Sequence, residues 1–128
     1  MRVRDIMHTT VRTIAPVETT SFAGELLRRY DIHYLVVTEG KKNVVGVIAD
    51  RDLVSVDENT PVRDVMTHPP VTIGPDETPR KAAALMTGHG IGSLPVIEDG
   101  ELAGIVTTSD LLSMIAKGRL HPGSSKRK

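Results

Sequence analysis

The chain opens on Val3-Arg4-Asp5-Ile6-Met7, and the same pattern returns as Val62-Arg63-Asp64-Val65-Met66. Two further stretches recur: Thr13-Ile14-x-Pro16 returns as Thr72-Ile73-x-Pro75, and residues 46–53 return as residues 104–111. The first two pairs are offset by 59 residues and the last by 58. This self-similarity predicts two copies of one supersecondary unit, neither of which is expected to fold alone. We expect the functional site where the two copies meet.

Composition narrows the classes of protein that fit. The 16 basic and 16 acidic residues cancel and aromatic residues are scarce, which does not favour binding to nucleic acid. The absence of cysteine excludes disulfides and thiolate chemistry. No apolar run approaches the roughly 20 residues of a membrane span, and the amino terminus lacks a signal-peptide pattern. We therefore expect a soluble cytoplasmic protein with no membrane association.

Each copy predicts the same order of elements. A short helical turn at residues 3–7 precedes an extended stretch at 11–14 and a helix capped by Thr19 or Thr20, or by Thr78 in the second copy. Helical spacing gives each of these helices an apolar face that we expect in the core. The faces comprise Phe22, Ala23, Leu26, Leu27 and Tyr30 in the first copy, and Ala82, Ala83, Leu85 and Met86 in the second.

A strand–turn–strand follows in both copies. Asp99-Gly100 between β-branched runs predicts a hairpin with a type I′ turn. A last short helix is expected to begin near Asp52 and near Asp110. The fold class is therefore α/β, with two β-α-β-β-α repeats packed as one pseudo-twofold module. We expect the first repeat at 1–57, the second at 58–118, and a flexible basic tail at 119–128.

One motif could carry chemistry, because Gly104-x-x-Thr107-x-Ser109-Asp110 lies where a strand gives way to a helix. A helix amino terminus offers free N–H groups and a positive dipole end to phosphate. A carboxylate can accept hydrogen bonds from both hydroxyls of a ribose, and small hydroxyls can bind ribose or phosphate. The same residues also fit an ordinary helix cap that binds nothing. Both interpretations stay open at this point.

The repeated motifs resemble the cystathionine β-synthase (CBS) domain, and two in tandem resemble the pair called a Bateman module. The resemblance extends from about Val3 to about Ala116. It rests on the two Val-Arg-Asp-Ile/Val-Met openings, the Leu-x-Val hairpin strands and the Gly-hydrophobic-x-Thr/Ser-x-x-Asp motif.

The resemblance implies two clefts between the repeats that hold an adenosine-containing ligand, such as AMP, ADP, ATP, NAD(H) or S-adenosylmethionine. In the better cleft it places Thr107 and Asp110 on the ribose and Ser109 near phosphate. Thr10, Val11 and Arg12 would form the opposite wall, and His33 and Tyr34 lie where the family lines the centre of the cleft.

The first copy departs from the family pattern because Ala49 replaces the Thr or Ser of the motif, although Asp52 is kept. Arg51, at the position of Ser109, could meet phosphate as a charged donor. The resemblance completes this second, weaker cleft with Pro70, Val71, Gly92 and Ser93. Loss of one hydroxyl costs about 1 kcal/mol, so we predict unequal sites. Asp52 as a cap only remains an equal alternative.

The leading hypothesis is a stand-alone regulatory module that senses an adenosyl effector, with or without magnesium, and forms a homodimer. It would signal by conformational change to a regulated enzyme or transporter. The alternative is a protein–protein interaction module with degenerate sites. An enzyme is not expected, because the sequence offers no nucleophile–base pair, no metal-ligand spacing and no phosphate loop. No cofactor is required and no metal site is predicted.

Overall fold

The computed structural model describes residues 1–118, and the predicted tail lies outside them. These residues form two compact units. Unit 1 comprises Met1–Thr9, Val71–Asp99 and the chain from Ala103 onward, and unit 2 comprises Thr10–Pro70 and Gly100–Leu102. The compact units therefore differ from the sequence repeats, because the opening segment of each repeat belongs to the unit built by the other repeat.

Backbone hydrogen bonds hold these exchanged openings in matching ways. The openings form two 3-10 turns, η1 (Val3–Asp5) and η3 (Val62–Asp64). The bonds are Val3 N to Glu77 O and Arg4 N to Pro75 O, both 2.9 Å, in unit 1, and Val62 N to Glu18 O at 2.8 Å and Arg63 N to Pro16 O at 3.0 Å in unit 2. Each acceptor in unit 1 is the repeat equivalent of the acceptor in unit 2.

Unit 2 is built on a three-stranded sheet in the order β1-β2-β3. Its elements are β1 (Thr13–Ile14), α1 (Thr20–Tyr30), β2 (Tyr34–Glu39), β3 (Asn43–Ala49) and the 3-10 turn η2 (Asp50–Leu53). β1 runs parallel to β2, and β2 pairs antiparallel with β3. The parallel pair needs a crossover, which α1 supplies.

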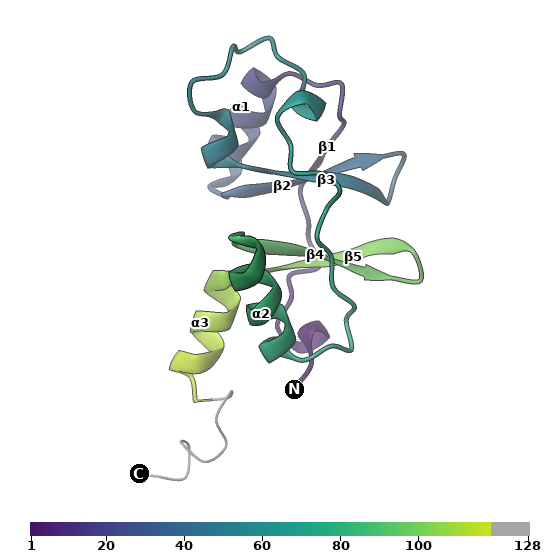
Figure 1. Ribbon diagram of the computed structural model, residues 1–128, viewed down its shortest axis with the longest axis vertical. Helices are drawn as coiled ribbons and strands as arrows, with labels where there is room; N and C mark the ends of the chain where they lie inside the picture. Colours follow the sequence, from purple (N-terminus) through teal and green to yellow (C-terminus); the bar gives the residue numbers. More distant parts are fainter. Residues whose placement is uncertain (119–128) are drawn as a thin grey trace. The chain divides into compact units, whose positions relative to one another are not determined.

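Unit 1 repeats this plan with α2 (Pro79–His89), β4 (Ser93–Glu98), β5 (Glu101–Thr107) and α3 (Thr108–Ala116). The counterpart of β1 is reduced to a single parallel bridge between Ile73 and Val96. Both α2 and α3 lie on one side of the β4–β5 hairpin (Figure 1). The predicted α/β architecture of two repeats is confirmed.

Local signals in the sequence account for the ends of these elements. Thr19 caps α1 by accepting a hydrogen bond from Phe22 N, and Thr78 caps α2 by accepting one from Lys81 N, both at 3.1 Å. The turn at Asp99-Gly100 has positive φ at both residues, 53° and 81°. Such a pair matches the type I′ turn that favours two-residue hairpins. The predicted caps and hairpin are therefore confirmed.

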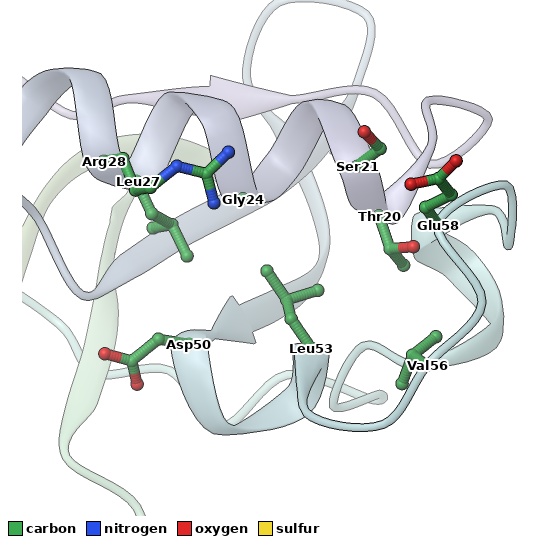
Figure 2. Close-up of a pocket in the computed structure, with 9 residues that line it drawn as sticks. All are labelled: Thr20, Ser21, Gly24, Leu27, Arg28, Asp50, Leu53, Val56 and Glu58. Carbon is green, nitrogen blue, oxygen red and sulfur yellow. The ribbon is translucent and has the colours of Figure 1, made fainter.

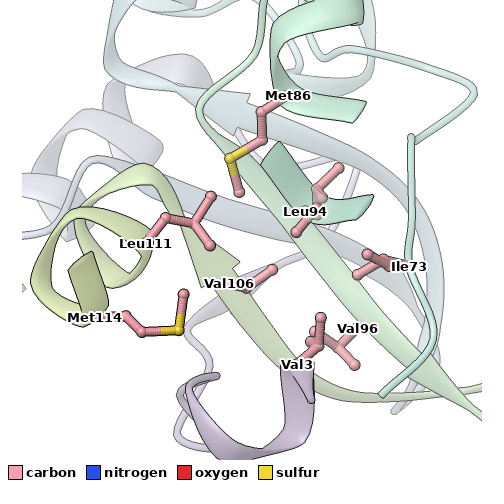
Figure 3. Close-up of a cluster of buried hydrophobic side chains, with 9 residues drawn as sticks. Val3, Ile73, Met86, Leu94, Val96, Val106, Leu111 and Met114 are labelled. Atoms are coloured by element: carbon pink, nitrogen blue, oxygen red, sulfur yellow. The ribbon is translucent and has the colours of Figure 1, made fainter. Parts of the chain in front are cut away.

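Each unit has its own buried core. In unit 1, the side chains of α2, α3 and both strands converge on one cluster that also receives Val3 from the amino-terminal turn (Figure 3). In unit 2, Val62 takes the same place among the side chains of α1, β1, β2 and β3. Val3 and Val62 are both fully buried. The Val-Arg-Asp opening thus recurs in the sequence because each unit completes its core with one of these valines.

Arg4 also ties η1 to unit 1. Its guanidinium lies 3.0 Å from Asp76 Oδ1 and 2.9 Å from Glu98 Oε2. The hydrogen bond to Asp76, and to a smaller extent the one to Glu98, raises the pKa of Arg4 above its ordinary value. The exchanged turn is therefore held by apolar, backbone and ionic contacts together.

Two expectations about the helices were wrong. Phe22 and Tyr30 do not lie in the core, because their side chains are 37% and 38% exposed, whereas Ala23 and Leu27 are buried. The apolar stripe of α1 is thus wider than the part that packs. The last element of the first repeat is the single turn η2 rather than a short α-helix, because Val54 is extended and Ser55 has a φ of 60°.

Candidate functional site

The turn between β5 and α3 brings three motif residues together in unit 1. Asp110 Oδ2 accepts hydrogen bonds from Thr107 N at 2.8 Å and from Thr107 Oγ1 at 3.1 Å. Asp110 stands at the third position of α3, where a carboxylate can reach back to satisfy the N–H before the helix. Ser109 is exposed beside it. The motif residues therefore form a compact polar turn at a helix amino terminus.

Unit 2 carries the same turn with fewer polar groups. Asp52 Oδ2 accepts a hydrogen bond from Ala49 N at 2.8 Å, which matches the bond of Asp110. Ala49 provides no hydroxyl, and the element that follows is only the four residues of η2. The backbone bond is thus common to both turns, whereas the hydroxyl and the longer helix are found in unit 1.

The motif glycines are needed for the exchanged openings to pack. A Cβ at Gly104 would lie 2.7 Å from the carbonyl oxygen of His8 and 2.8 Å from Met7 Sδ. A Cβ at Gly46 would lie 2.9 Å from Met66 Cγ and 3.0 Å from the carbonyl oxygen of Thr67. These separations are closer than real Cβ contacts allow, so the two glycines admit the segment after each Val-Arg-Asp turn.

The predicted site residues are divided between the two units. Unit 1 holds Thr107, Ser109, Asp110, Val71, Gly92 and Ser93, and unit 2 holds Thr10, Val11, Arg12, His33, Tyr34, Arg51, Asp52 and Pro70. Each predicted cleft draws on both units, so the assembly of either cleft stays a prediction.

Some of these residues meet within one unit. Thr108 N donates to Gly92 O at 3.0 Å in unit 1, and Asp50 N donates to His33 O at 3.1 Å in unit 2. These two bonds are equivalent in the repeats, and each fixes the start of one strand against the polar turn at the end of its partner. His33 Nδ1 also lies 2.9 Å from Asp50 Oδ2.

Arg12 lies elsewhere in unit 2. Its guanidinium carbon is 3.8 Å from the centroid of the Tyr30 ring, a cation–π contact just before β1. Its carbonyl accepts a hydrogen bond from Val36 N at 3.2 Å. The contact with Tyr30 explains why an aromatic side chain of α1 sits at the surface.

The sequence reasoning missed His8. Its Nε2 atom lies 2.7 Å from Asp110 Oδ1, and its backbone pairs with Ile105 of β5. His8 follows the first repeated opening and is the counterpart of Thr67. That difference between the repeats is visible in the sequence. The sequence alone does not show that His8 contacts Asp110, because the two residues are 102 positions apart.

A pocket of about 370 Å³ lies within unit 2, and it contains none of the predicted site residues. Figure 2 shows it between α1 and η2, with Leu27 and Leu53 facing its interior and Arg28, Asp50 and Glu58 around it. The short η2 leaves this space beside α1. In unit 1 the longer α3 packs against α2 and contributes Leu111 and Met114 to the core.

Residues 1–118 lack two further kinds of feature. Within that part of the chain, no group of three or more His, Asp or Glu side chains is arranged to hold a metal ion. Its helices are also all too short or too polar to cross a membrane.

Comparison with known proteins gives two family matches within the chain. The model of the CBS domain matches residues 3–59 and residues 62–117. The CBS domain-containing protein YhcV of Bacillus subtilis is 32% identical over 115 residues, which cover 85% of this chain and 81% of YhcV.

Two further relatives differ in what surrounds the matched region. Inosine-5'-monophosphate dehydrogenase of Korarchaeum cryptofilum is 36% identical over 111 residues, which cover 85% of this chain but only 22% of the enzyme. Among solved structures, that of CBSX2 in complex with AMP is 26% identical, with a TM-score of 0.83, and the match covers 92% of this chain and 98% of CBSX2.

Proposed function

The chain belongs to the CBS domain family as a tandem pair, and from this premise we propose that it is a regulatory module that binds an adenosine-containing effector. The effector class comprises AMP, ADP, ATP, NAD(H) and S-adenosylmethionine. The proposed sites combine the motif turn of one unit with the early strand of the other. Binding would shift a conformational equilibrium that a partner detects, to the extent that the effector prefers one state.

The observation that carries this proposal is the polar turn around Asp110. A carboxylate at the third position of a helix, next to a threonine hydroxyl and at the positive end of the helix dipole, suits a ribose next to a phosphate. Ser109 is exposed next to Asp110 and available to such a ligand. The AMP complex of CBSX2, whose chain is matched almost in full, supports the same ligand class.

We propose that the two sites differ in affinity. Ala49 offers no hydroxyl where Thr107 has one, and a hydrogen bond of this kind contributes about 1 kcal/mol. Arg51, at the position of Ser109, offers phosphate a charged donor that offsets part of this loss. The Asp110 site is therefore the tighter one.

Homodimer formation is also part of the proposal. On α3, Leu112 and Ile115 are 66% and 45% exposed, while Leu111 and Met114 face the core of unit 1. Two apolar side chains three residues apart form one stripe on the outer face of the helix. A twofold contact between copies would cover it. The regulated partner would be an enzyme or a transporter, and the compartment would be the cytoplasm.

The test is a thermal-shift panel with AMP, ADP, ATP, NAD(H) and S-adenosylmethionine, with and without magnesium. An effector at about 100 times its Kd stabilises the folded protein by roughly 2.7 kcal/mol, which raises the Tm by several degrees. The shift should be lost in Asp110→Ala and largely kept in Asp52→Ala. Absence of any shift with the folded wild-type protein would overturn the proposal.

The alternative is an interaction module whose motif turns serve only to cap backbone. The matching bonds from Ala49 N to Asp52 and from Thr107 N to Asp110, both 2.8 Å, favour it, because they satisfy N–H groups without any ligand. Under this alternative, Asp110→Ala would lower stability by about 1 kcal/mol and no adenosyl compound would bind to either variant or wild type.

A further inference from the structure

His8 closes one side of the Asp110 carboxylate. The imidazole Nε2 lies 2.7 Å from Oδ1, while Oδ2 already receives the N–H and the hydroxyl of Thr107. The Asp110 side chain is 10% exposed and the His8 side chain is 66% exposed. The His8 side chain therefore faces solvent, whereas the Asp110 side chain is held within the turn.

The hydrogen-bonding capacity of Asp110 is nearly used up by these three contacts. A carboxylate has about four acceptor positions, and a ribose diol needs two of them. Three positions are occupied, so a diol cannot bind to Asp110 unless one contact is broken. The Thr107 N–H bond belongs to the helix cap, and the Thr107 hydroxyl is itself part of the proposed ribose site. His8 is therefore the partner that must leave.

The second repeat provides an internal comparison. Thr67 is the counterpart of His8, and its backbone pairs with Val47 as His8 pairs with Ile105. The paired bonds are 2.9 Å and 3.2 Å for Thr67, and both 2.9 Å for His8. In the described part of the chain no histidine contacts Asp52, so the imidazole contact distinguishes the Asp110 turn from its counterpart.

We propose that His8 is a built-in competitor of the effector, so that a ligand must displace its imidazole from Asp110 to bind. This inference rests on the proposed function, because it concerns the regulation of the same site. Displacement costs more when the imidazole is charged, since hydrogen bonds between ionised groups are stronger. A ligand at this site therefore binds more weakly than it would if His8 were absent.

The other charged groups on the elements next to His8 do not replace it. On η1, Arg4 pairs with Asp76 and Glu98, and Asp5 accepts a hydrogen bond from Arg2 N. On α3, Asp110 is the only charged residue, and on β5 the only one is Glu101 at the opposite end of the strand. The competition for Asp110 therefore centres on the His8–Asp110 pair.

The experiment compares wild type with His8→Thr by isothermal titration with adenosine. Threonine is chosen because Thr67 already occupies the equivalent backbone bridge, so the variant is expected to fold. His89→Thr, an exposed histidine at the end of α2, is the matched control. Adenosine is used rather than AMP because it presents the ribose diol without a phosphate, so its affinity reports on the contact with Asp110.

His8→Thr should bind adenosine about threefold to tenfold more tightly than wild type, the range for an exposed charged contact. His89→Thr should bind adenosine as tightly as wild type, because His89 makes no contact with Asp110 in the described residues.

The outcomes separate the two proposals. If wild type binds adenosine and His8→Thr binds equally or more weakly, the competitor role is wrong while the proposed function stands. If only His8→Thr binds, both are supported. If neither folded protein binds adenosine or any compound of the thermal-shift panel, the proposed function fails and the competitor role fails with it.

Discussion

The Asp110 turn and the Asp52 turn occupy matching positions in the two repeats, and they share one backbone hydrogen bond of 2.8 Å. They differ in what surrounds that bond. The Asp110 turn has the Thr107 hydroxyl, the His8 imidazole and a nine-residue helix, whereas the Asp52 turn has Ala49 and four residues of 3-10 turn. The shared hydrogen bond caps the backbone in both turns. The hydroxyl, the imidazole and the length of the helix differ, and these features affect packing and the proposed ligand binding.

The largest expected effect is a difference in the free energy of unfolding contributed by α3 and by η2. Met114→Ala should lower the free energy of unfolding by about 3 kcal/mol, because its side chain is 2% exposed and leaves a cavity. Leu53→Ala should cost roughly 1 kcal/mol, since Leu53 is only partly buried at the edge of the unit 2 pocket. Urea unfolding measures both values. Equal losses would show that the two elements contribute alike to their cores.

The next effect concerns the two motif glycines, where the repeats should agree. Gly104→Ala and Gly46→Ala should each cost about 2 kcal/mol, because the added methyl group meets the exchanged opening segment. The same unfolding assay applies. Gly88→Ala in α2 is the control, and it should stabilise slightly because nothing lies within 4 Å of its Cβ position. Neutral substitutions at both motif positions would mean that the openings can shift without loss.

The helix caps should again treat the two repeats equally. Thr19→Ala and Thr78→Ala each remove a 3.1 Å hydrogen bond to a backbone N–H, at a cost of about 1 kcal/mol. Thermal unfolding followed by circular dichroism would detect either loss. Serine at the same positions should restore most of the stability, and failure of serine to do so would point to a role for the threonine methyl group.

The smallest expected effect would make the two turns more alike. Ala49→Thr gives the first repeat the hydroxyl that the second already has, and it should tighten effector binding at the Asp52 site by roughly threefold. Isothermal titration in the Asp110→Ala background isolates that site. No gain in this background would indicate that the Asp52 turn serves only as a cap.

Much of the fold could be predicted from local sequence. The caps at Thr19 and Thr78 and the Asp99-Gly100 turn depend on residues within three positions of one another, so short patterns were sufficient. The wide apolar stripe of α1 misled the prediction, because periodicity marks a face of the helix but does not limit how much of it packs. Phe22 and Tyr30 accordingly lie at the surface.

The exchange of the opening segments could not be predicted in the same way. Val3 and Val62 are each followed by Arg-Asp in the sequence, so this shared pattern does not tell which core each valine enters. The motif glycines are part of the predicted ligand motif in the sequence, whereas their close contacts include Met7 and Met66. The His8–Asp110 contact depends on this exchange, since it joins residues 102 positions apart.

The exchange has a consequence for the order in which the chain can fold during synthesis. Unit 2 is nearly continuous from Thr10 to Pro70, while unit 1 joins the first nine residues to segments that begin at Val71. During synthesis, most of the unit 2 core can therefore form before the ribosome has made the segments from Val71 onward that pack against η1. Closing that long loop carries an entropic cost that grows only slowly with its length. In refolding, unit 1 is complete only after this loop closes, so pulsed hydrogen exchange should protect β2 and β3 before β4 and β5.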